Sequence, residues 1–529
     1  MKLSKRTICL LLCFAMSASL LSGCRSYETP RETTAETTVE TEAATVDTAS
    51  SAAGNRPLTL CFSSGDSINP FTATNLYNCA LDSLLFEGLV RVDEDYSVQN
   101  VLCDSVSTTD GLTYVIHVAS GIAMHDGSTL TADDVVYSIQ TAAASEKYKT
   151  RFANLASVAV SGELTVTAVL NSVNFGFSAL LDIPIVKSGT GGDDVPVGSG
   201  PYVYSAADGA YTLTAFSGYR DYTSLQKNEI ALSDLEFSAT ANAFTDGSLD
   251  FLVSDPTDTG TYYLKYSCDT KYFSTSVLQY LGFNTEKAVV NKSEFRRALY
   301  LLIDRQSLIS SVMDGHALAA PVIFSPEASF YSDTFESGKD PSAASAASIL
   351  TALGYVDKDG DGLYETPEGA DFTLVFIVNS GNKYKTEAAR AIADTLIAAG
   401  ISVDLQILSW TDYQAALAAG NYDLYYGEVR LTNDFDLTCL FGTGGAVNYG
   451  KIADANLTSL SAAFLASSTE EAKVSAAAAL CDAVYQSSAI IPLWYKQYCV
   501  ITRRNFVTGV SPVYGSIYGN IAQWQFSQG

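Results

Sequence analysis

Positively charged residues and histidines are scarce in this chain of 529 residues. It contains 31 lysines and arginines against 58 aspartates and glutamates, so its formal net charge is -27 at pH 7. A surface this acidic repels phosphate, and we therefore expect no nucleic-acid partner. The three histidines, His117, His125 and His316, leave little material for a histidine-rich metal centre or a histidine-based catalytic triad.

Two further features are missing from the sequence. No Cys-x-x-Cys spacing occurs, so neither a zinc motif nor a redox motif is indicated. After the N-terminal segment, no uninterrupted apolar run approaches the roughly 18 residues that a membrane-spanning helix needs. The cysteines that follow Cys24 are odd in number and mostly have apolar neighbours, so at least one is unpaired and we expect buried thiols. They are Cys61, Cys79, Cys103, Cys268, Cys439, Cys481 and Cys499.

The first 23 residues have the pattern of a targeting segment. A short basic start is followed by a mostly apolar run, 8–21, that is too short for a comfortable bilayer span. The segment ends in Leu21-Ser22-Gly23-Cys24, which resembles the lipobox of bacterial lipoproteins, in which the chain is cut before a cysteine that then carries lipid. We therefore expect residues 1–23 to be a lipoprotein signal peptide and Cys24 to be lipidated. The alternative is an ordinary secretory signal with an incidental cysteine.

Residues 24–56 differ sharply in composition from the rest of the chain. They are rich in threonine, glutamate, serine and alanine, and they lack the apolar residues needed to build a core. We expect a solvated tether, whose typical reach as a flexible chain is roughly 30 Å. A protein held by lipid on such a tether is expected at the extracytoplasmic face of the cell membrane.

From residue 57 onward, strand-like and helix-like segments alternate, which predicts an α/β protein. Thr131 and Asp134 form a capping box at the start of one predicted helix. Asp304 is the expected N-cap of a second helix, and Asp340 that of a third over 341–354. The predicted strands are 58–62, 113–118, 164–170, 372–378 and 402–408.

Four blocks of sequence carry a resemblance to a known family. In order they are Ile68-Asn69-Pro70 with 85–90, Asp110-Gly111-Leu112-Thr113-Tyr114 with 124–138, Val197-Gly198-Ser199-Gly200-Pro201-Tyr202, and Tyr280-Leu281-Gly282-Phe283-Asn284-Thr285 with 297–306. Their order and spacing resemble the large solute-binding proteins of peptide- and nickel-type ABC importers, which form family 5. The glycine-rich third block lacks the spacing of a nucleophile elbow, so we expect a turn before a strand there.

The resemblance implies a two-lobed, periplasmic-binding-protein-like (Venus flytrap) α/β fold with an extra subdomain inserted in lobe I. Lobe I would contain 57–87, 189–279 and 498–529, the inserted subdomain 88–188, and lobe II 280–497. A small ligand would bind between the lobes and pass to the permease subunits of an ABC transporter, and the ligand expected first is a short peptide. The resemblance implies a monomer that is not an enzyme and needs no cofactor.

Other interpretations remain open from the sequence. The same fold could take a non-peptide ligand such as a chelated metal or an oligosaccharide. A surface hydrolase that uses paired carboxylates is a further alternative, because acidic residues are plentiful.

The resemblance also suggests ligand-binding residues. In peptide-binding relatives, the aspartate of an Asp-aromatic pair holds the α-ammonium of the ligand, and backbone beside it pairs with the peptide as an added strand. Asp434 is the first candidate for this aspartate and Asp436 the second. The segment that precedes them supplies backbone and side chains that could face the cleft; it includes Tyr426, Gly427, Glu428, Val429 and Arg430.

Two alternatives accompany these candidates. Arg430 could instead pair with one of the two aspartates. Trp410 and Trp494, like Tyr426, lie in segments expected at the cleft, but aromatic residues there could equally belong to the core.

One acidic loop, 357–368, has the spacing of an EF-hand calcium loop. Its candidate ligands are Asp357, Asp359, Asp361, Glu365 and Glu368. The second helix of an EF-hand is not predicted after it, so the alternatives are a structural calcium site and a metal-free tight turn.

Overall fold

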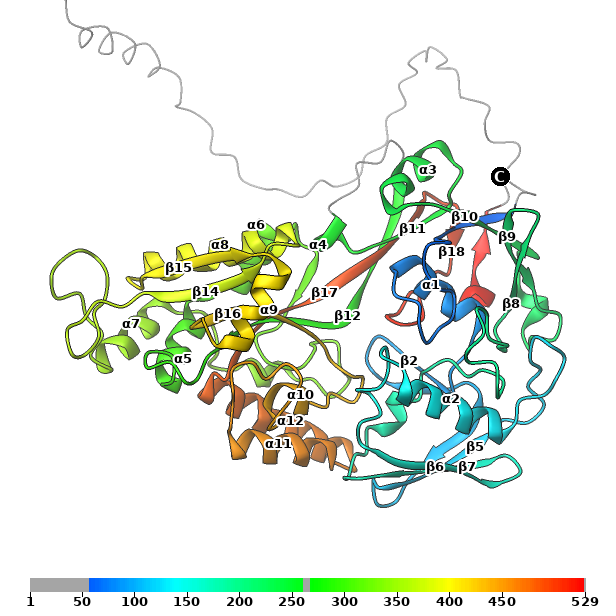
Figure 1. Ribbon diagram of the computed structural model, residues 1–529, viewed down its shortest axis with the longest axis horizontal. Coiled ribbons are helices and arrows are strands. Elements are labelled where there is room, and N and C mark those ends of the chain that lie inside the picture. Colours follow the sequence, from blue (N-terminus) through cyan, green and yellow to red (C-terminus); the bar gives the residue numbers. More distant parts are fainter. Residues whose placement is uncertain (1–56, 260–266, 528–529) are drawn as a thin grey trace, which may run out of the picture. The chain divides into compact units, whose positions relative to one another are not determined.

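Two long antiparallel strands, β12 (Cys268–Phe283) and β17 (Ile490–Arg503), link the two halves of the described chain (Figure 1). This computed structural model describes residues 57–259 and 267–527. The predicted signal peptide, Cys24 and the tether therefore lie outside the described residues.

The pairing of β12 with β17 changes along its length. The first half of β12 pairs with 497–503, and the second half pairs with 490–495. Between Ser274 and Leu278 the register shifts, and such a bulge bends the strand that carries it.

The bulge separates two sets of hydrophobic cores. The buried residues of one core come from 58–273 and 499–524, whereas those of the two others all come from 278–495. We call the part built on the first core lobe I and the part built on the other two lobe II. The chain thus passes from lobe I to lobe II along β12 and returns along β17.

Lobe I contains two four-stranded sheets, ordered β1-β10-β9-β8 and β4-β5-β7-β6. Its helices and strands are β1 (Leu58–Phe62), α1 (Leu76–Leu85), β2 (Val90–Val92), β3 (Val98–Asn100), β4 (Cys103–Ser107), β5 (Thr113–Val118), α2 (Ala132–Ala144), β6 (Leu155–Gly162), β7 (Thr165–Leu170), β8 (Tyr202–Ala207), β9 (Ala210–Ala215), β10 (Glu229–Asp234), α3 (Thr240–Asp246), β11 (Phe251–Ser254), α4 (Pro256–Thr259), β18 (Val507–Thr508) and β19 (Gln525–Phe526).

Lobe II has helices on both faces of the sheet to which β12 and β17 belong, ordered β11-β17-β12-β16-β14-β15. Neighbouring residues of β14 point to opposite faces of the sheet and enter different cores. Phe376 packs in the core that contains α5, α7 and α8, and Ile377 packs in the core that contains α9, α11 and α12. The elements are α5 (Ser293–Leu302), α6 (Arg305–Val312), β13 (Ala317–Ala319), α7 (Ala343–Ala352), β14 (Leu374–Asn379), α8 (Lys383–Ala398), β15 (Val403–Leu408), α9 (Trp410–Ala419), β16 (Leu424–Arg430), α10 (Thr438–Phe441), α11 (Ala455–Leu465) and α12 (Glu470–Ser487).

The structure confirms the five predicted strands to within two residues at their ends. It also confirms the capping box of α2 and Asp304 as the N-cap of α6. The predicted cap of α7 is wrong: the helix begins two residues later than expected, with Ser342 as its cap instead of Asp340. The backbone N–H of Ser342 donates to the carbonyl of Leu301 at 2.7 Å, which fixes Ser342 outside the helix, and its hydroxyl accepts from the amide of Ser345.

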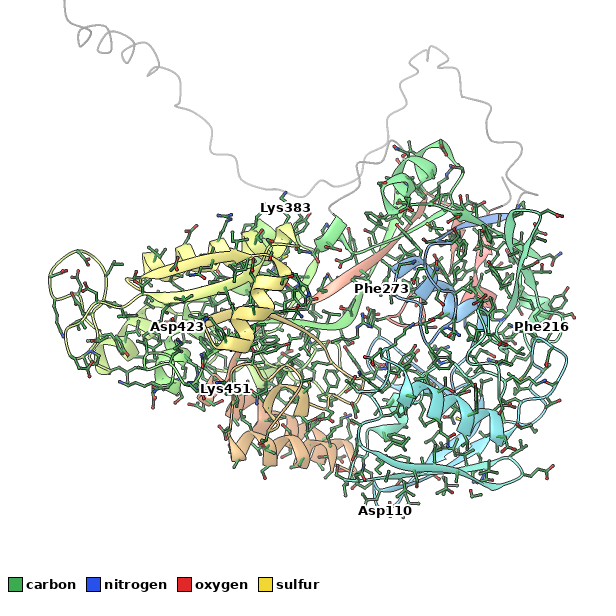
Figure 2. All side chains as sticks on the ribbon, in the orientation of Figure 1. Asp110, Phe216, Phe273, Lys383, Asp423 and Lys451 are labelled. Carbon is green, nitrogen blue, oxygen red and sulfur yellow. The ribbon has the colours of Figure 1, made fainter. Side chains whose placement is uncertain are left out.

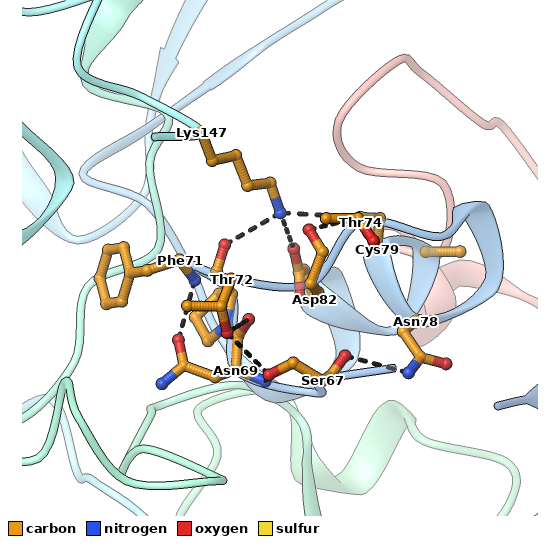
Figure 3. A network of polar contacts seen from close by, with 12 residues as sticks. Ser67, Asn69, Phe71, Thr72, Thr74, Asn78, Cys79, Asp82 and Lys147 are labelled. Atoms are coloured by element: carbon orange, nitrogen blue, oxygen red, sulfur yellow. Dashed lines mark hydrogen bonds and ion pairs between the residues drawn. The ribbon is translucent and has the colours of Figure 1, made fainter. Parts of the chain in front are cut away.

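Asn69 of the first block holds together the loop that leads into α1. Its side-chain amide donates to the carbonyls of Gly191 and Asp193 at 2.9 and 2.7 Å. Beside it, Lys147 donates to the carbonyl of Pro70 at 2.9 Å and pairs with Asp82 on α1 at 3.3 Å (Figure 3). This network fixes the position of α1 in lobe I.

The second and third blocks contact each other and α1. The backbone N–H of His125 donates to the carbonyl of Gly198, and that of Gly200 to the carbonyl of Leu85. A Cβ on Gly198 would lie 2.3 Å from the oxygen of Leu85, so only glycine fits this close approach. The segment leads into β8, which confirms the expected turn before a strand.

Of the described cysteines, Cys61, Cys103, Cys481 and Cys499 are buried free thiols, and Cys79 and Cys439 are half-buried free thiols. None of the helices in the described ranges combines the length and the apolar character that crossing a bilayer requires.

Candidate ligand-binding site

Asp434 lies directly after β16 and is buried between the lobes, with 3% of its surface exposed. One carboxylate oxygen accepts from the Asn174 side chain of lobe I at 2.7 Å, and the other from the hydroxyl of Thr432 at 2.5 Å. Burial raises the pKa of this carboxyl, the nearby charge of Asp436 raises it further, and the bond from Thr432 opposes the rise. No lysine or arginine of the described ranges lies within ion-pair distance of Asp434, and the ammonium of Lys473 on α12 acts on this carboxylate only from farther away.

The loop that carries Asp434 makes several contacts with lobe I. Asn433 donates to the carboxylate of Asp182 at 2.9 Å. The ring of Phe435 lies 4.7 Å from the ring of Tyr96, centroid to centroid. Both aromatic residues have a positive φ, 58° and 63°, which is rare for bulky side chains. The lobes therefore meet at this loop through two strained residues.

Asp436, the second candidate, has a local role. It is half-buried, and its carboxylate accepts from the backbone N–H of Thr438 at 2.9 Å, at the start of α10. It contacts Asp434 only through its own backbone amide, at 3.3 Å. Of the two candidates, only Asp434 is placed between the lobes by its hydrogen bonds.

β16 leaves one edge open just before this loop. On one side it pairs with β12 along its whole length, from Leu424 to Arg430. On its other side, β14 pairs only with Leu424 and Tyr425, and no described strand pairs with 426–430. Unpaired strand backbone is a template for an added strand.

Gly427 and Val429 of this strand also serve the packing of lobe II. A Cβ on Gly427 would lie 2.5 Å from the ring of Tyr280 on β12, so a side chain does not fit there. Val429 is buried in the core that contains Tyr280. The absence of a side chain at Gly427 and the side chain of Val429 therefore serve the packing of lobe II, and only the backbone of these residues is available at the open edge.

Glu428 and Arg430 project away from the buried Val429, as the alternation along a strand predicts. Glu428 pairs with Lys385 at 3.0 Å and accepts from Gln279 at 2.7 Å. Partial burial acts to raise the pKa of Glu428, but the charges of Lys385 and Lys496 outweigh it and hold that pKa below its usual value.

Arg430 extends toward lobe I, where its guanidinium lies 5.4 Å from the ring centre of Tyr514. The alternative that Arg430 pairs with Asp434 or Asp436 is wrong, because within the described ranges it forms no ion pair with a carboxylate. It offers a positive charge on the same side of lobe II as the open edge of β16.

The three aromatic candidates do not contact this region as expected. Tyr426 and Trp494 are buried in lobe II, where both donate to the side-chain oxygen of Gln279, at 2.6 and 2.8 Å. Trp410 is the first residue of α9, with 57% of its surface exposed, and it stacks on Tyr413. Tyr426 and Trp494 are therefore core residues, because Gln279 satisfies their polar atoms inside the lobe.

The acidic loop brings together three of its five candidates. Oxygen atoms of Asp357, Asp359 and Asp361 lie within 4.8 Å of one another, and all three residues are exposed. Glu365 turns inward and accepts from the backbone N–H of Lys358 at 2.7 Å, and Glu368 lies outside the group. Calcium takes six to eight oxygen ligands, so these carboxylates fit the ion in type but supply too few ligands by themselves. A structural calcium ion stays a prediction.

Sequence reasoning missed Asn174, Lys385 and Gln279. Asn174 is 260 positions from Asp434, and no motif marks it. Gln279 directly precedes the fourth block, but its amide carries no sequence signal of its own.

Comparison with known proteins places this site in context. Residues 97–438 match the family model described as "Bacterial extracellular solute-binding proteins, family 5 Middle". The oligopeptide-binding protein AppA of Bacillus subtilis is 25% identical over 388 residues, which cover 67% of this chain and 69% of AppA. Protein XP55 of Streptomyces lividans is 26% identical over 351 residues, 62% of this chain. The match spans less than two thirds of the length of XP55, 63%.

Solved structures show the same fold. AppA from Bacillus subtilis in complex with a nonapeptide matches with a TM-score of 0.66 and 22% identity, over 89% of this chain and 99% of AppA. NikZ from Campylobacter jejuni in complex with Ni(L-His) matches with a TM-score of 0.67 and 18% identity, over 89% and 99%. These similarities show the two-lobed α/β fold expected from the sequence.

Proposed function

Since the chain belongs to family 5 of the bacterial extracellular solute-binding proteins, we propose that it captures short peptides between its lobes and delivers them to the permease of an ABC importer. The observation that carries this proposal is the open edge of β16, which runs into a buried aspartate that forms no ion pair among the described residues. The relative AppA, whose solved complex contains a nonapeptide, supports a peptide as the ligand.

Asp434 is the proposed partner of the peptide's α-ammonium. A carboxylate buried without a cation is costly, and an ammonium between the lobes supplies the missing charge. The peptide backbone that follows would pair with 426–430 as an added strand. Thr432 and Asn174 hold the carboxylate in place for this contact.

Arg430 is the proposed partner of a negative group on the ligand. Its guanidinium forms no ion pair with any described residue and lies near Tyr514 in lobe I, so a ligand carboxylate would face it from the same cleft. Glu428 is neutralised by Lys385 and has no such free charge.

No bond is made or broken in the proposed function. Asp434 contacts Asn174, Thr432 and the backbone of Asp436, and among the described residues no second carboxylate or water-activating base is its hydrogen-bond partner. The proposed role is therefore that of a receptor, and the membership of the chain in a family of solute-binding proteins supports it.

The test is titration calorimetry with free and N-acetylated forms of the same tripeptides, followed by mass spectrometry of the recovered ligand. Free peptides are expected to bind and to return intact, and acetylated peptides to bind at least about tenfold more weakly. Equal binding of both forms would show that the protein does not recognise the α-ammonium of the peptide. It would favour a non-peptide ligand, such as the metal chelate bound in the solved structure of NikZ.

We further propose that the protein is a monomer, lipid-anchored through Cys24 at the extracytoplasmic face of the cell membrane. The lipobox-like sequence and the absence of any other long apolar run support the anchor. Cys24→Ala is expected to move the protein from the membrane fraction to the soluble fraction. Membrane retention of a processed Cys24→Ala protein would refute lipidation at this residue.

A further inference from the structure

A small cavity lies where lobe I, the bulge of β12 and the loop after β16 meet. Its wall includes Glu94 and Tyr96 of the β2–β3 turn, Ser274 and Ser276 of β12, Asn433, and Tyr514. Ser274 directly follows Phe273, which Figure 2 labels on β12. The cavity has room for at least one group the size of a water molecule.

Two carboxylates at this cavity have no cation. Glu94 is part of the wall, and Glu327 of lobe II lies behind Ser274. Burial raises the pKa of Glu327, the hydroxyl of Ser274 opposes the rise, and the charge of Glu94 adds to it. Among the described residues, neither glutamate forms an ion pair, whereas the neighbouring Asp93 is paired with Arg91 at 2.8 Å. Glu94 is exposed and Glu327 half-buried, and the guanidinium of Arg430 lies 5.4 Å from the ring of Tyr514 in the cavity wall without pairing with either glutamate.

Ser274 gives an independent indication of a ligand. The residue is 9% exposed, it lines the cavity, and its hydroxyl oxygen forms no hydrogen bond of normal geometry. The buried oxygen Oε2 of Glu327 is also without such a bond. Buried polar atoms without partners are rare in native proteins, because each one costs the hydrogen bonds that it would make in water. The Ser274 hydroxyl can donate its proton toward Glu327, which leaves the lone pairs of Ser274 Oγ and of Glu327 Oε2 as acceptors for a further donor.

We propose that this cavity takes the primary ammonium of a basic ligand side chain, of the lysine or ornithine type. An ammonium has the size of a water molecule, carries three N–H donors and brings the missing positive charge. The proposal rests on the proposed function, because the side chain would belong to the peptide held at β16.

Both lobes contribute to the cavity. The backbone N–H of Ser329 in lobe II donates to the carbonyl of Asp95 in lobe I at 2.9 Å, and the rings of Tyr96 and Phe435 close the same side. A cation bound here contacts both lobes at once and therefore favours the closed arrangement. The net charge of -27 also attracts cationic ligands to the molecule.

The cavity can be tested without a peptide. We expect n-butylammonium at pH 7 to raise the melting temperature of the full chain, whereas the neutral n-butanol does not. Glu94→Gln and Glu327→Gln are expected to remove the effect. Glu163→Gln, an exposed glutamate of the β6–β7 turn that makes the same change in net charge, is expected to keep it. No stabilisation by the amine, or equal stabilisation of wild type and Glu94→Gln, would overturn the proposal.

Peptides then test the ligand class. Calorimetry with Ala-Lys-Ala and Ala-norleucine-Ala, which differ only in the ammonium, is expected to show about tenfold tighter binding of the lysine peptide. Glu94→Gln should bring the ratio of the two affinities close to one, and Glu163→Gln should preserve it. If the wild type binds the lysine and norleucine peptides with equal affinity, the proposal that the cavity takes a basic side chain is wrong. If neither peptide binds, the proposed function fails, and the amine experiment still decides whether the cavity takes an ammonium.

Discussion

Two acidic loops of lobe II, 432–436 and 357–361, have similar sequences and opposite surroundings. In the first, Asp434 is buried, and its partners include a side chain from lobe I. In the second, all three aspartates are exposed, and the hydrogen bonds of Asp357 go to backbone amides of its own loop. Alternating aspartates alone therefore do not indicate a binding site. What distinguishes the first loop is that burial has removed water from a carboxylate that forms no ion pair among the described residues and feels the charge of Lys473 only at longer range.

The largest expected effect is that of Asp434→Asn on peptide affinity. The substitution removes the counter-charge of the ammonium, and loss of one partner from a buried charge pair costs roughly 2–5 kcal/mol. Affinity should therefore fall by more than about tenfold in calorimetry. Asp436→Asn is the matched control, since its amide oxygen can still accept from Thr438. If Asp436→Asn loses more peptide affinity than Asp434→Asn, the partner of the ammonium is Asp436 and not Asp434.

A smaller effect is expected when the lobe I partner of Asp434 is removed. Asn174→Ala deletes the bond to Asp434 and a second bond from the amide of Gly176 at 2.8 Å, but it leaves the charge of Asp434 in place. Peptide affinity should fall about fivefold, the equivalent of one hydrogen bond of about 1 kcal/mol. Asn171→Ala, at an exposed asparagine of the same connection, should bind like the wild type. An unchanged Asn174→Ala protein would show that this bond does not support the closed state.

Asp82 offers a test of burial away from the proposed site. Burial raises the pKa of this carboxyl and Lys147 only partly opposes the rise, while the oxygen Oδ1 has no hydrogen-bond partner. The folded protein therefore binds the proton more readily than the unfolded chain. As the pH falls from 7 toward the ordinary aspartate value of about 4, the wild type should gain stability relative to Asp82→Asn. Urea unfolding at several pH values measures this difference, and a constant difference would contradict the raised pKa.

The smallest effects are expected in the exposed loop. Because only three carboxylates converge there, calorimetry should show at most weak, millimolar calcium binding to the wild type, and none to Asp361→Ala. The stability of Asp361→Ala in the absence of calcium should lie within about 0.5 kcal/mol of the wild type, as for most surface substitutions. Micromolar binding that is lost in the variant would establish a calcium site and remove the contrast between the loops.

Local signals in the sequence predicted much of the fold. The capping box at Thr131 and the cap at Asp304 depend on neighbours within four residues, and both are confirmed. The cap of α7 was misplaced because Ser342 is held by a backbone bond to Leu301, a contact that no local pattern shows. The blocks of the family predicted the two-lobed fold.

The site was less predictable because it depends on contacts between distant segments. Asp434 was a candidate by its place in a motif, but its burial depends on Asn174 in the other lobe. The sequence left Trp494 between cleft and core, because an aromatic residue on a strand can face either side. Its hydrogen bond to Gln279 inside lobe II shows that it belongs to the core. No sequence motif marks Glu94 or Ser274, because the cavity that they line forms only when three separate parts of the chain come together.

The passage of the chain along β12 and back along β17 makes lobe II an insert with adjacent ends. Leu278 and Tyr495 are paired across the two strands, so the points at which the chain enters and leaves lobe II are neighbours. A segment with neighbouring ends can be exchanged as a cassette without rebuilding its host. Grafting lobe II of a relative between these two positions would therefore transplant its half of the ligand specificity onto an unchanged lobe I, and the same junction is a natural insertion point for a fluorescent reporter of lobe closure.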